Sequence, residues 1–306
     1  MFDPKSPQAL AISDLFVITL LIAAGILLLV TGLVLYIAFR YRYKPGMGEP
    51  PQNFGHTPLE IGWTAGPVLI LAVLLVLTVI GMAQSDPEVK AQQQPDLTVT
   101  AHQWWWEIRY TQSGIVTANE VRLPVGRRML VRLDSADVVH DLWIPELARK
   151  MDMTPGHPTT IWLQADKPGV YPGACAEYCG VQHAKMGILA IAQPQAEFDA
   201  WVRQQTQVPA QPTSGSAARG LQEFKEETCI SCHAINGVAT TPHAGPDLTH
   251  IASRRTLAAG VLENTPFNLG RWLQNPQAIK PGSYMPNVQL TKEEVQTLVD
   301  YMETLK

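Results

Sequence analysis

The chain has 306 residues, of which 16% are charged, and its formal net charge is −4. This length suits two ordinary domains, and the charge excludes the basic field that nucleic-acid binding requires, so we expect no nucleic-acid partner. The low charged fraction has a local cause, because two long stretches near the N-terminus contain no charged residue.

These two uncharged stretches, residues 15–39 and 61–85, predict transmembrane helices. Each has about 25 residues, enough to cross a hydrocarbon core of about 30 Å. A buried core helix or a signal peptide is the alternative, but a signal's apolar region is shorter and here a second span follows. The connecting loop begins with Arg40, Arg42 and Lys44, and short basic loops stay cytoplasmic. We therefore expect a lipid-contacting hairpin in a bacterial cytoplasmic membrane, with both termini and the later domains on the outer (periplasmic) side.

A polar tether over residues 86–95 follows the hairpin, so that residues 1–94 form the first region. Residues 95–205 then show short alternating or β-branched runs separated by turns rich in Pro and Gly, a pattern typical of strands. The predicted strands are 97–101, 128–133, 159–163 and 187–192, and a closing helix is predicted at 197–205. Such spacing indicates a β-sandwich or barrel of about 100 residues.

Residues 206–216 have the Pro, Ser and Gly composition of a flexible linker. From residue 217 to 306 the pattern becomes helical, with Pro- and Gly-rich loops between the periodic runs. Helices are predicted at 217–227, 267–274 and 291–305. The chain therefore ends in a separate helical domain.

Two thiols, an imidazole and a thioether fall within twelve residues, as Cys175, Cys179, His183 and Met186, and His140 lies upstream. Soft sulfur ligands combined with imidazoles favour copper over hard cations. One Cys would suit a mononuclear blue site, whereas two thiolates can bridge two copper ions, each completed by one His and one weak ligand. A Cys175–Cys179 disulfide and a tetrahedral zinc site with both His residues are the alternatives, and neither explains Met186.

The string Cys-x-Glu-x-Cys-Gly-x-x-His-x-x-Met at residues 175–186, His140 and the run His102-Gln-Trp-Trp-Trp resemble subunit II of cytochrome c oxidase. The resemblance covers roughly residues 10 to 205. It implies a cupredoxin-like Greek-key β-sandwich that holds the binuclear copper centre CuA. The implied ligands are the side chains of His140, Cys175, Cys179, His183 and Met186 and the backbone carbonyl of Glu177.

The resemblance also implies roles for four further residues. The Glu177 side chain would bind a magnesium ion at the interface with the catalytic subunit, with Asp152 as an acid close to that ion. Trp104 matches the aromatic through which electrons enter; half-buried strand packing is its alternative, and Trp105 would then face away from its neighbours. Glu60 matches an acid at the mouth of a proton-uptake channel, or is a helix-start charge stabilised by the dipole.

Cys229-Ile-Ser-Cys232-His233 is the CxxCH motif of covalent haem c attachment, with His233 as the proximal iron ligand. A redox-active dithiol is the alternative, but it usually belongs to a thioredoxin-like βαβ context that is absent here. Met285 lies in a loop before the last helix, and a Met/His pair raises the haem potential, so Met285 is the predicted second axial ligand. The other candidates are Met302, His243 and His250.

Residues 217–306 therefore resemble a class I cytochrome c, an all-α domain. In that family a Gly lets the first and last helices cross closely while aromatic side chains seal the contact. Gly220 and Phe224 on the first helix and Leu298 and Tyr301 on the last match this arrangement.

Together the two sites resemble subunit II of a caa-type haem–copper oxidase, which carries its own cytochrome. We expect electrons to pass from cytochrome c or a similar donor through haem c and CuA to a haem–copper catalytic subunit I, assembled with other oxidase subunits. Oxygen would be reduced to water there, coupled to proton translocation, because this chain lacks the many membrane His residues that hold the catalytic haems. The alternatives are a subunit of a CuA-containing nitric oxide reductase and a membrane-tethered copper-delivery or redox module.

Overall fold

The structure, a computed structural model, describes residues 3–85, 93–227, 229–240 and 244–306. The predicted tether therefore lies mostly outside the described residues, and so does His243. The chain divides into two compact units, one containing the two long N-terminal helices and the other containing residues 3–7 and 89–306.

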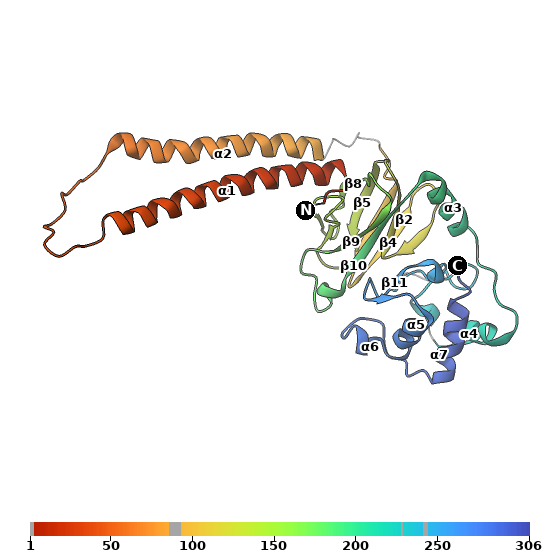
Figure 1. Cartoon of the computed structure of the whole chain (residues 1–306). Helices are drawn as coiled ribbons and strands as arrows, with labels where there is room; N and C mark the ends of the chain where they lie inside the picture. The colour runs from red at the N-terminus through yellow and green to blue at the C-terminus, as the bar shows by residue number, and fades with distance from the viewer. Residues whose placement is uncertain (1–2, 86–92, 228, 241–243) are drawn as a thin grey trace. The chain divides into compact units, whose positions relative to one another are not determined.

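The two N-terminal helices are α1 (Pro7–Arg40) and α2 (Thr57–Ser85), with 34 and 29 residues. Both are long and apolar enough to cross a membrane, and Figure 1 shows them as two long ribbons. Most of their Leu, Ile and Val residues are exposed. A helix that is apolar all round needs a nonpolar surrounding. The Gln8 side chain donates to the Ser85 carbonyl oxygen at 2.6 Å, which ties the start of α1 to the end of α2. The predicted hairpin is confirmed, although each helix begins several residues earlier than predicted, because Pro7 and Pro58 are compatible with a first turn.

Ten strands and the helix α3 (Gln195–Gln205) make up the domain that follows. The strands are β1 (Leu97–His102), β2 (Trp105–Tyr110), β3 (Val116–Ala118), β4 (Glu120–Pro124), β5 (Met129–Ser135), β6 (His140–Trp143), β7 (Met151–Met153), β8 (Thr159–Leu163), β9 (Gly169–Cys175) and β10 (Gly187–Gln193). They form two five-stranded sheets with the orders β3-β2-β1-β5-β8 and β4-β10-β9-β6-β7. The pairs β1–β5 and β4–β10 are parallel, so the chain crosses between the sheets. The predicted cupredoxin-like sandwich is confirmed.

The inner faces of the two sheets share one core. Along β1 the residues alternate between buried and half-buried, and Leu97, Val99 and Ala101 are fully buried, as the alternating sequence predicts. Trp106 and Ile108 of β2 join the same core. This close packing holds the strand ends that carry the candidate copper ligands.

The C-terminal domain contains α4 (Gly215–Glu226), α5 (Pro266–Gln274), α6 (Pro276–Ile279) and α7 (Lys292–Met302). It also contains one small hairpin, β11 (Thr256–Leu257) with β12 (Leu262–Glu263), which a strictly all-α prediction did not include. Short 3₁₀ turns span Cys229–Ser231 and Ile251–Ser253 in this domain, and another spans His183–Lys185 in the sandwich. The helical cytochrome c fold is confirmed.

The first and last helices of this domain cross at Gly220. A Cβ there would lie 2.0 Å from the Thr297 carbonyl oxygen, so only glycine permits the approach. The rings of Phe224 and Tyr301 lie 6.1 Å apart beside the crossing, and Leu298 is fully buried. The arrangement implied by the resemblance is confirmed.

The sandwich and the cytochrome domain are hydrogen-bonded to each other. The Gly187 amide donates to the Ala259 carbonyl oxygen at 2.9 Å. The buried Glu120 carboxylate accepts from the amides of Arg255 and Thr256 at 2.6 and 2.9 Å. These contacts place the two candidate metal sites in one compact unit.

Candidate metal centres

The first candidate site lies at one end of the second sheet. His140 begins β6, Cys175 ends β9, and Met186 directly precedes β10. The adjacent strands β6 and β9 bring His140 and Cys175 together, while the turn between β9 and β10 carries Cys179 and His183. A single turn thus supplies most of the donors, and the neighbouring strand supplies one more imidazole.

All six predicted donor atoms converge. The Sγ atoms of Cys175 and Cys179 lie 3.8 Å apart, far from the roughly 2.05 Å of a disulfide. The Nδ1 atom of His140 lies 3.8 Å from Cys175 Sγ, and His183 Nδ1 lies 3.7 Å from Cys179 Sγ. Met186 Sδ lies 3.8 Å from Cys179 Sγ, and the Glu177 carbonyl oxygen lies 3.2 Å from Cys175 Sγ.

This donor set exceeds the needs of a structural zinc site, which takes four ligands in a closed tetrahedron. Two thiols between two imidazoles, with a thioether and a carbonyl as further donors, suit a pair of soft metal ions. The residues present therefore fit a binuclear copper centre. Among the described residues, His140, Cys175 and Cys179 are also the group of His, Cys and acidic side chains whose ligand atoms lie within 4.8 Å of one another.

Electrostatics favour a thiolate at this site before any metal binds. The hydrogen bond from the Cys179 thiol, together with that from His140, lowers the pKa of Cys175 to about 3. The resulting Cys175 thiolate, and then burial, raise the pKa of Cys179 above its usual value. Because thiolates rather than thiols bind metals, the pair is partly prepared for a cation.

Asp137 orients the first imidazole and was not predicted from the sequence. Its Oδ1 lies 2.8 Å from His140 Nε2, which leaves His140 Nδ1 free to face the thiols. Such a carboxylate partner fixes the tautomer of a metal-binding His. Asp137 is held in turn by the amides of Gln103 and Val138 at 2.6 and 2.7 Å.

Two further carboxyl groups face each other across β6 and β7. Asp141 and Asp152 are direct partners in this ladder. Burial raises the pKa of Asp141 to about 7, and the neighbouring Asp152 adds to the rise. Asp152 and the side chain of Glu177 are both exposed, so they face the surroundings of the chain rather than its core.

The three consecutive Trp residues point in two directions. Trp104 and Trp106 belong to the core of the sandwich, whereas Trp105 packs with Ala118 and Ala259. The expected alternation is confirmed. The Trp104 Nε1–H donates to the Cys179 carbonyl oxygen at 3.0 Å, which connects this ring to the donor turn.

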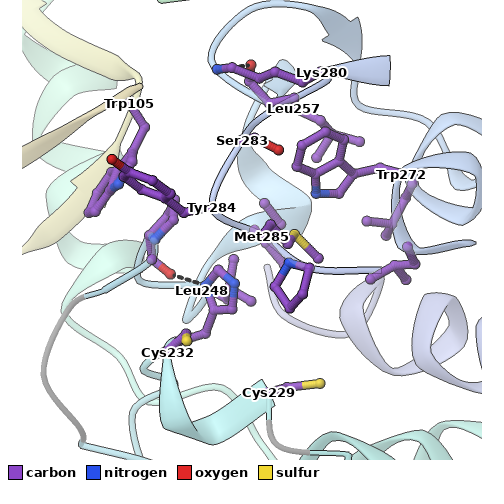
Figure 2. A pocket seen from close by; sticks show the side chains of 18 of the residues that line it. Trp105, Cys229, Cys232, Leu248, Leu257, Trp272, Lys280, Ser283, Tyr284 and Met285 are labelled. Carbon is purple, nitrogen blue, oxygen red and sulfur yellow. Dashed lines mark hydrogen bonds between the residues drawn. The ribbon is translucent and has the colours of Figure 1, made fainter. Parts of the chain in front are cut away.

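The second candidate site is an apolar cavity of about 470 Å³ in the cytochrome domain (Figure 2). Cys229, Cys232 and His233 line it together with Met285 and Trp272, and Figure 2 shows the two thiols on its lower side with Met285 above them. Its volume lies within the range of ligand pockets, and its lining is mostly hydrophobic. The residues present therefore fit a large flat apolar cofactor held by two thioethers.

His233 is locked in place for ligation. Its Nδ1 lies 2.7 Å from the Pro246 carbonyl oxygen, so Nδ1 carries the proton and Nε2 keeps a free lone pair. A Cβ on Gly245 would lie 2.6 Å from the imidazole, so glycine is required beside it. Burial lowers the pKa of His233 below its usual value, which keeps the ring neutral.

The structure distinguishes Met285 from two of the other candidate axial ligands, His250 and Met302. His250 does not line the haem cavity. Its Nδ1 and Nε2 atoms lie within hydrogen-bond distance of the Lys306 and Gln205 carbonyl oxygens, at 2.7 and 3.1 Å. Met302 does line it, but from the buried face of α7. Met285 lies in the loop between α6 and α7, as the sequence predicts.

Glu60 lies in the first turn of α2. Its Oε1 accepts from the His56 amide at 3.1 Å, the contact expected of an acid at a helix start. This contact fits the structural alternative for Glu60 and does not bear on a role in proton uptake.

Comparisons with known proteins match these regions in order. The family description "Cytochrome C oxidase subunit II, transmembrane domain" matches residues 1–80, "Cytochrome C oxidase subunit II, periplasmic domain" matches residues 113–193, and "Cytochrome c" matches residues 217–306. Cytochrome c oxidase subunit 2 of Alkalihalophilus pseudofirmus is 38% identical over 310 residues, covering 99% of this chain and 90% of that protein. The chain belongs to the cytochrome c oxidase subunit II family.

The chain is also similar to two other proteins. Quinol oxidase subunit 2 of Bacillus cereus is 34% identical over 209 residues, covering 67% of this chain and 72% of that protein. The crystal structure of the periplasmic domain of subunit II of cytochrome oxidase from Bradyrhizobium japonicum is 30% identical, with a TM-score of 0.35, over 37% of this chain and 95% of that one. As a subunit II with its own cytochrome c domain, the chain is a membrane protein of a haem–copper oxidase, with copper and haem c as its implied cofactors.

Proposed function

We propose that this subunit II accepts electrons at haem c, passes them to a binuclear CuA centre and delivers them to the haem–copper catalytic subunit. There oxygen would be reduced to water, coupled to proton translocation. The observation that carries the proposal is the convergence of six copper donors and a haem-sized cavity within one compact unit.

The predicted site residues would hold the two cofactors. His140, Cys175, Cys179, His183, Met186 and the Glu177 carbonyl hold the copper pair. Cys229 and Cys232 attach the haem, with His233 and Met285 as the axial ligands of its iron. Each bound centre accepts and releases one electron at a time. The chain's own groups orient the ligand imidazoles, through Asp137 beside His140 and the Pro246 carbonyl oxygen beside His233.

The buried Trp104 supports haem c as the point at which an external donor delivers electrons. Its side chain is only 6% exposed, and the chain's own Tyr284 lies against its ring. An external protein therefore has little access to Trp104. We propose that Trp104 instead receives electrons from the attached cytochrome domain, after cytochrome c or a similar donor has reduced it.

Three carboxylates belong to the same proposal. The exposed Glu177 side chain and Asp152 would contribute to a magnesium site completed by the catalytic subunit. Glu60 would lie near a proton-uptake path, since it is at the start of α2 where the basic loop ends. The metal domains would lie on the outer face because that loop carries Arg40, Arg42 and Lys44.

The test is to purify the chain with its partner subunits and to measure reduction of oxygen and of nitric oxide with a reduced cytochrome c. We expect oxygen reduction, together with the mixed-valence electron-spin signature of two coppers. The Cys175→Ser variant should lose that signature, because one bridging thiolate is not enough. Turnover with nitric oxide alone would assign the chain to a nitric oxide reductase, and labile single copper without turnover would indicate a copper-delivery module.

A further inference from the structure

A short segment after α6, residues 279–285, lies against the turn that carries the copper donors. Lys185 Nζ donates to the Ile279 carbonyl oxygen at 2.7 Å. The Gln182 side-chain amide donates to the Pro281 carbonyl oxygen. Both donors come from the turn between Cys179 and Met186, so this segment is fastened to one metal site while it ends at Met285 of the other.

Lys280 fastens the same segment to Trp104. Its Nζ donates to the Trp104 carbonyl oxygen at 2.7 Å and to the Ala258 carbonyl oxygen at 3.2 Å. The Lys280 side chain is buried, which is unusual for a lysine and indicates that these two bonds are its main partners. These bonds fix residues 279–281, the start of the segment, beside Trp104 and the copper-donor turn.

Tyr284 is connected to the Cys179 carbonyl oxygen by two routes. Its ring lies 5.2 Å from that of Trp104, at an interplanar angle of 33°, and Trp104 Nε1 donates to the Cys179 carbonyl oxygen at 3.0 Å. The Tyr284 hydroxyl donates to Gln103 Oε1 at 2.7 Å, and Gln103 Nε2 donates to the same carbonyl oxygen at 2.8 Å. Both routes thus reach the backbone of a copper donor.

The position of Tyr284 is not explained by packing. Its side chain is 68% exposed, and a residue so exposed adds little to a hydrophobic core. Yet it lines the haem cavity, is bonded directly to Met285 in the chain, and stands between that loop and β2 (Figure 2). The Tyr284 ring adds a direct aromatic contact with Trp104 to the hydrogen bonds that join this segment to the copper-donor turn.

We propose that Tyr284 is the bridge through which electrons pass from haem c to Trp104 and the copper centre. This inference rests on the proposed function. One electron leaves the ferrous iron, which becomes ferric, and the mixed-valence copper pair becomes fully cuprous. No bond forms or breaks, no proton moves, and neither ring is itself oxidised, because the contact only provides electronic coupling.

The experiment compares wild-type oxidase with Tyr284→Phe and Tyr284→Leu in the full assembled complex. Haem c is reduced by a flash, and reduction of the copper centre is followed by its own absorption. We expect Tyr284→Leu to slow this step about tenfold, equivalent to about 1.4 kcal/mol in the barrier, and Tyr284→Phe to remain close to wild type. Phe267→Leu is the matched control, since Phe267 is an aromatic of the same domain that is 74% exposed and whose ring contacts Arg271.

Two readouts separate coupling from structure. The reduction potentials of both centres and the hydrogen exchange of residues 279–285 should not change in Tyr284→Leu. An unchanged transfer rate in that variant overturns the inference, and so does an equal slowing in Tyr284→Phe, which would assign the effect to the hydroxyl. If haem c of the wild-type complex fails to reduce the copper centre at all, the proposed function fails instead.

Discussion

The two metal sites of this chain are built by opposite means. The copper site is a set of polar and sulfur donors that strands and one turn hold 3.2 to 3.8 Å apart, each already bonded to a neighbour. The haem site is mainly a cavity of about 470 Å³ with apolar walls. The copper site is a preformed polar network, whereas the haem site is a hydrophobic core built around a cavity. The two sites should therefore respond differently to loss of their cofactors.

The largest difference is expected when the cofactors are withheld. At about 24 cal/mol per Å³, an unfilled cavity of this size costs on the order of 10 kcal/mol, comparable with the whole stability of a domain. A Cys229→Ser, Cys232→Ser double variant without haem should therefore leave residues 217–306 unfolded. Copper chelation should leave the sandwich folded. Limited proteolysis of the detergent-solubilised chain measures both, and a protease-resistant haem-free cytochrome domain would contradict the comparison.

The helix crossing that closes the haem cavity is the next place to test. In Gly220→Ala the new Cβ would meet the Thr297 carbonyl oxygen at 2.0 Å, and overpacking of this kind costs about 3 kcal/mol. Gly270→Ala on α5 is the matched control, because its nearest neighbours lie at ordinary distances of 3.6 and 3.7 Å. Urea unfolding followed by haem absorbance should show the loss only in the first variant. Equal midpoints would mean that the helices do not cross as described.

At the copper site the smaller change is to remove an orienting group rather than a ligand. Asp137→Asn should weaken copper affinity about ten- to a hundredfold while the fold is kept, because the His140 tautomer is no longer fixed by a carboxylate. Asp134→Asn provides the control, as its carboxylate pairs with Arg132 instead. Competition with a copper chelator measures the difference. Equal affinities in the two variants would show that Asp137 does not orient the ligand.

The smallest effect concerns pH at the contact between the two domains. Burial lowers the pKa of Lys280 to about 7, whereas the unfolded chain keeps the ordinary value of 10.5. The unfolded state then binds the proton more tightly, so the free energy of unfolding should rise with pH from about 7 upward, by about 1 kcal/mol in the first pH unit. Thermal unfolding over this range should show the rise in the wild type and not in Lys280→Met. A parallel rise in both would assign it to another group.

The sequence predicted four of the ten strands of the sandwich, and β9 shows why one of the others was missed. β8 was predicted with its observed bounds, and β1 and β10 within one residue at their ends. In contrast, β9 contains Gly169, Pro172 and Gly173, which indicate a turn when read locally. It is nevertheless a strand because β6 and β10 pair with it on either side. Pairing between distant segments overrode the local signal.

By itself, the sequence determined the hairpin, the two domain types and the candidate donors, because each depends on residues close together in the chain. Length and apolar composition are enough for a membrane helix, and the spacings Cys-x₃-Cys and CxxCH are local chemistry. The tertiary structure alone decided what surrounds those donors. Asp137 lies only three positions from His140, but nothing in the local pattern shows that its carboxylate meets that ring. Lys280 and Tyr284 contact Trp104 across up to 180 positions, for which a single sequence carries no periodic or compositional signal.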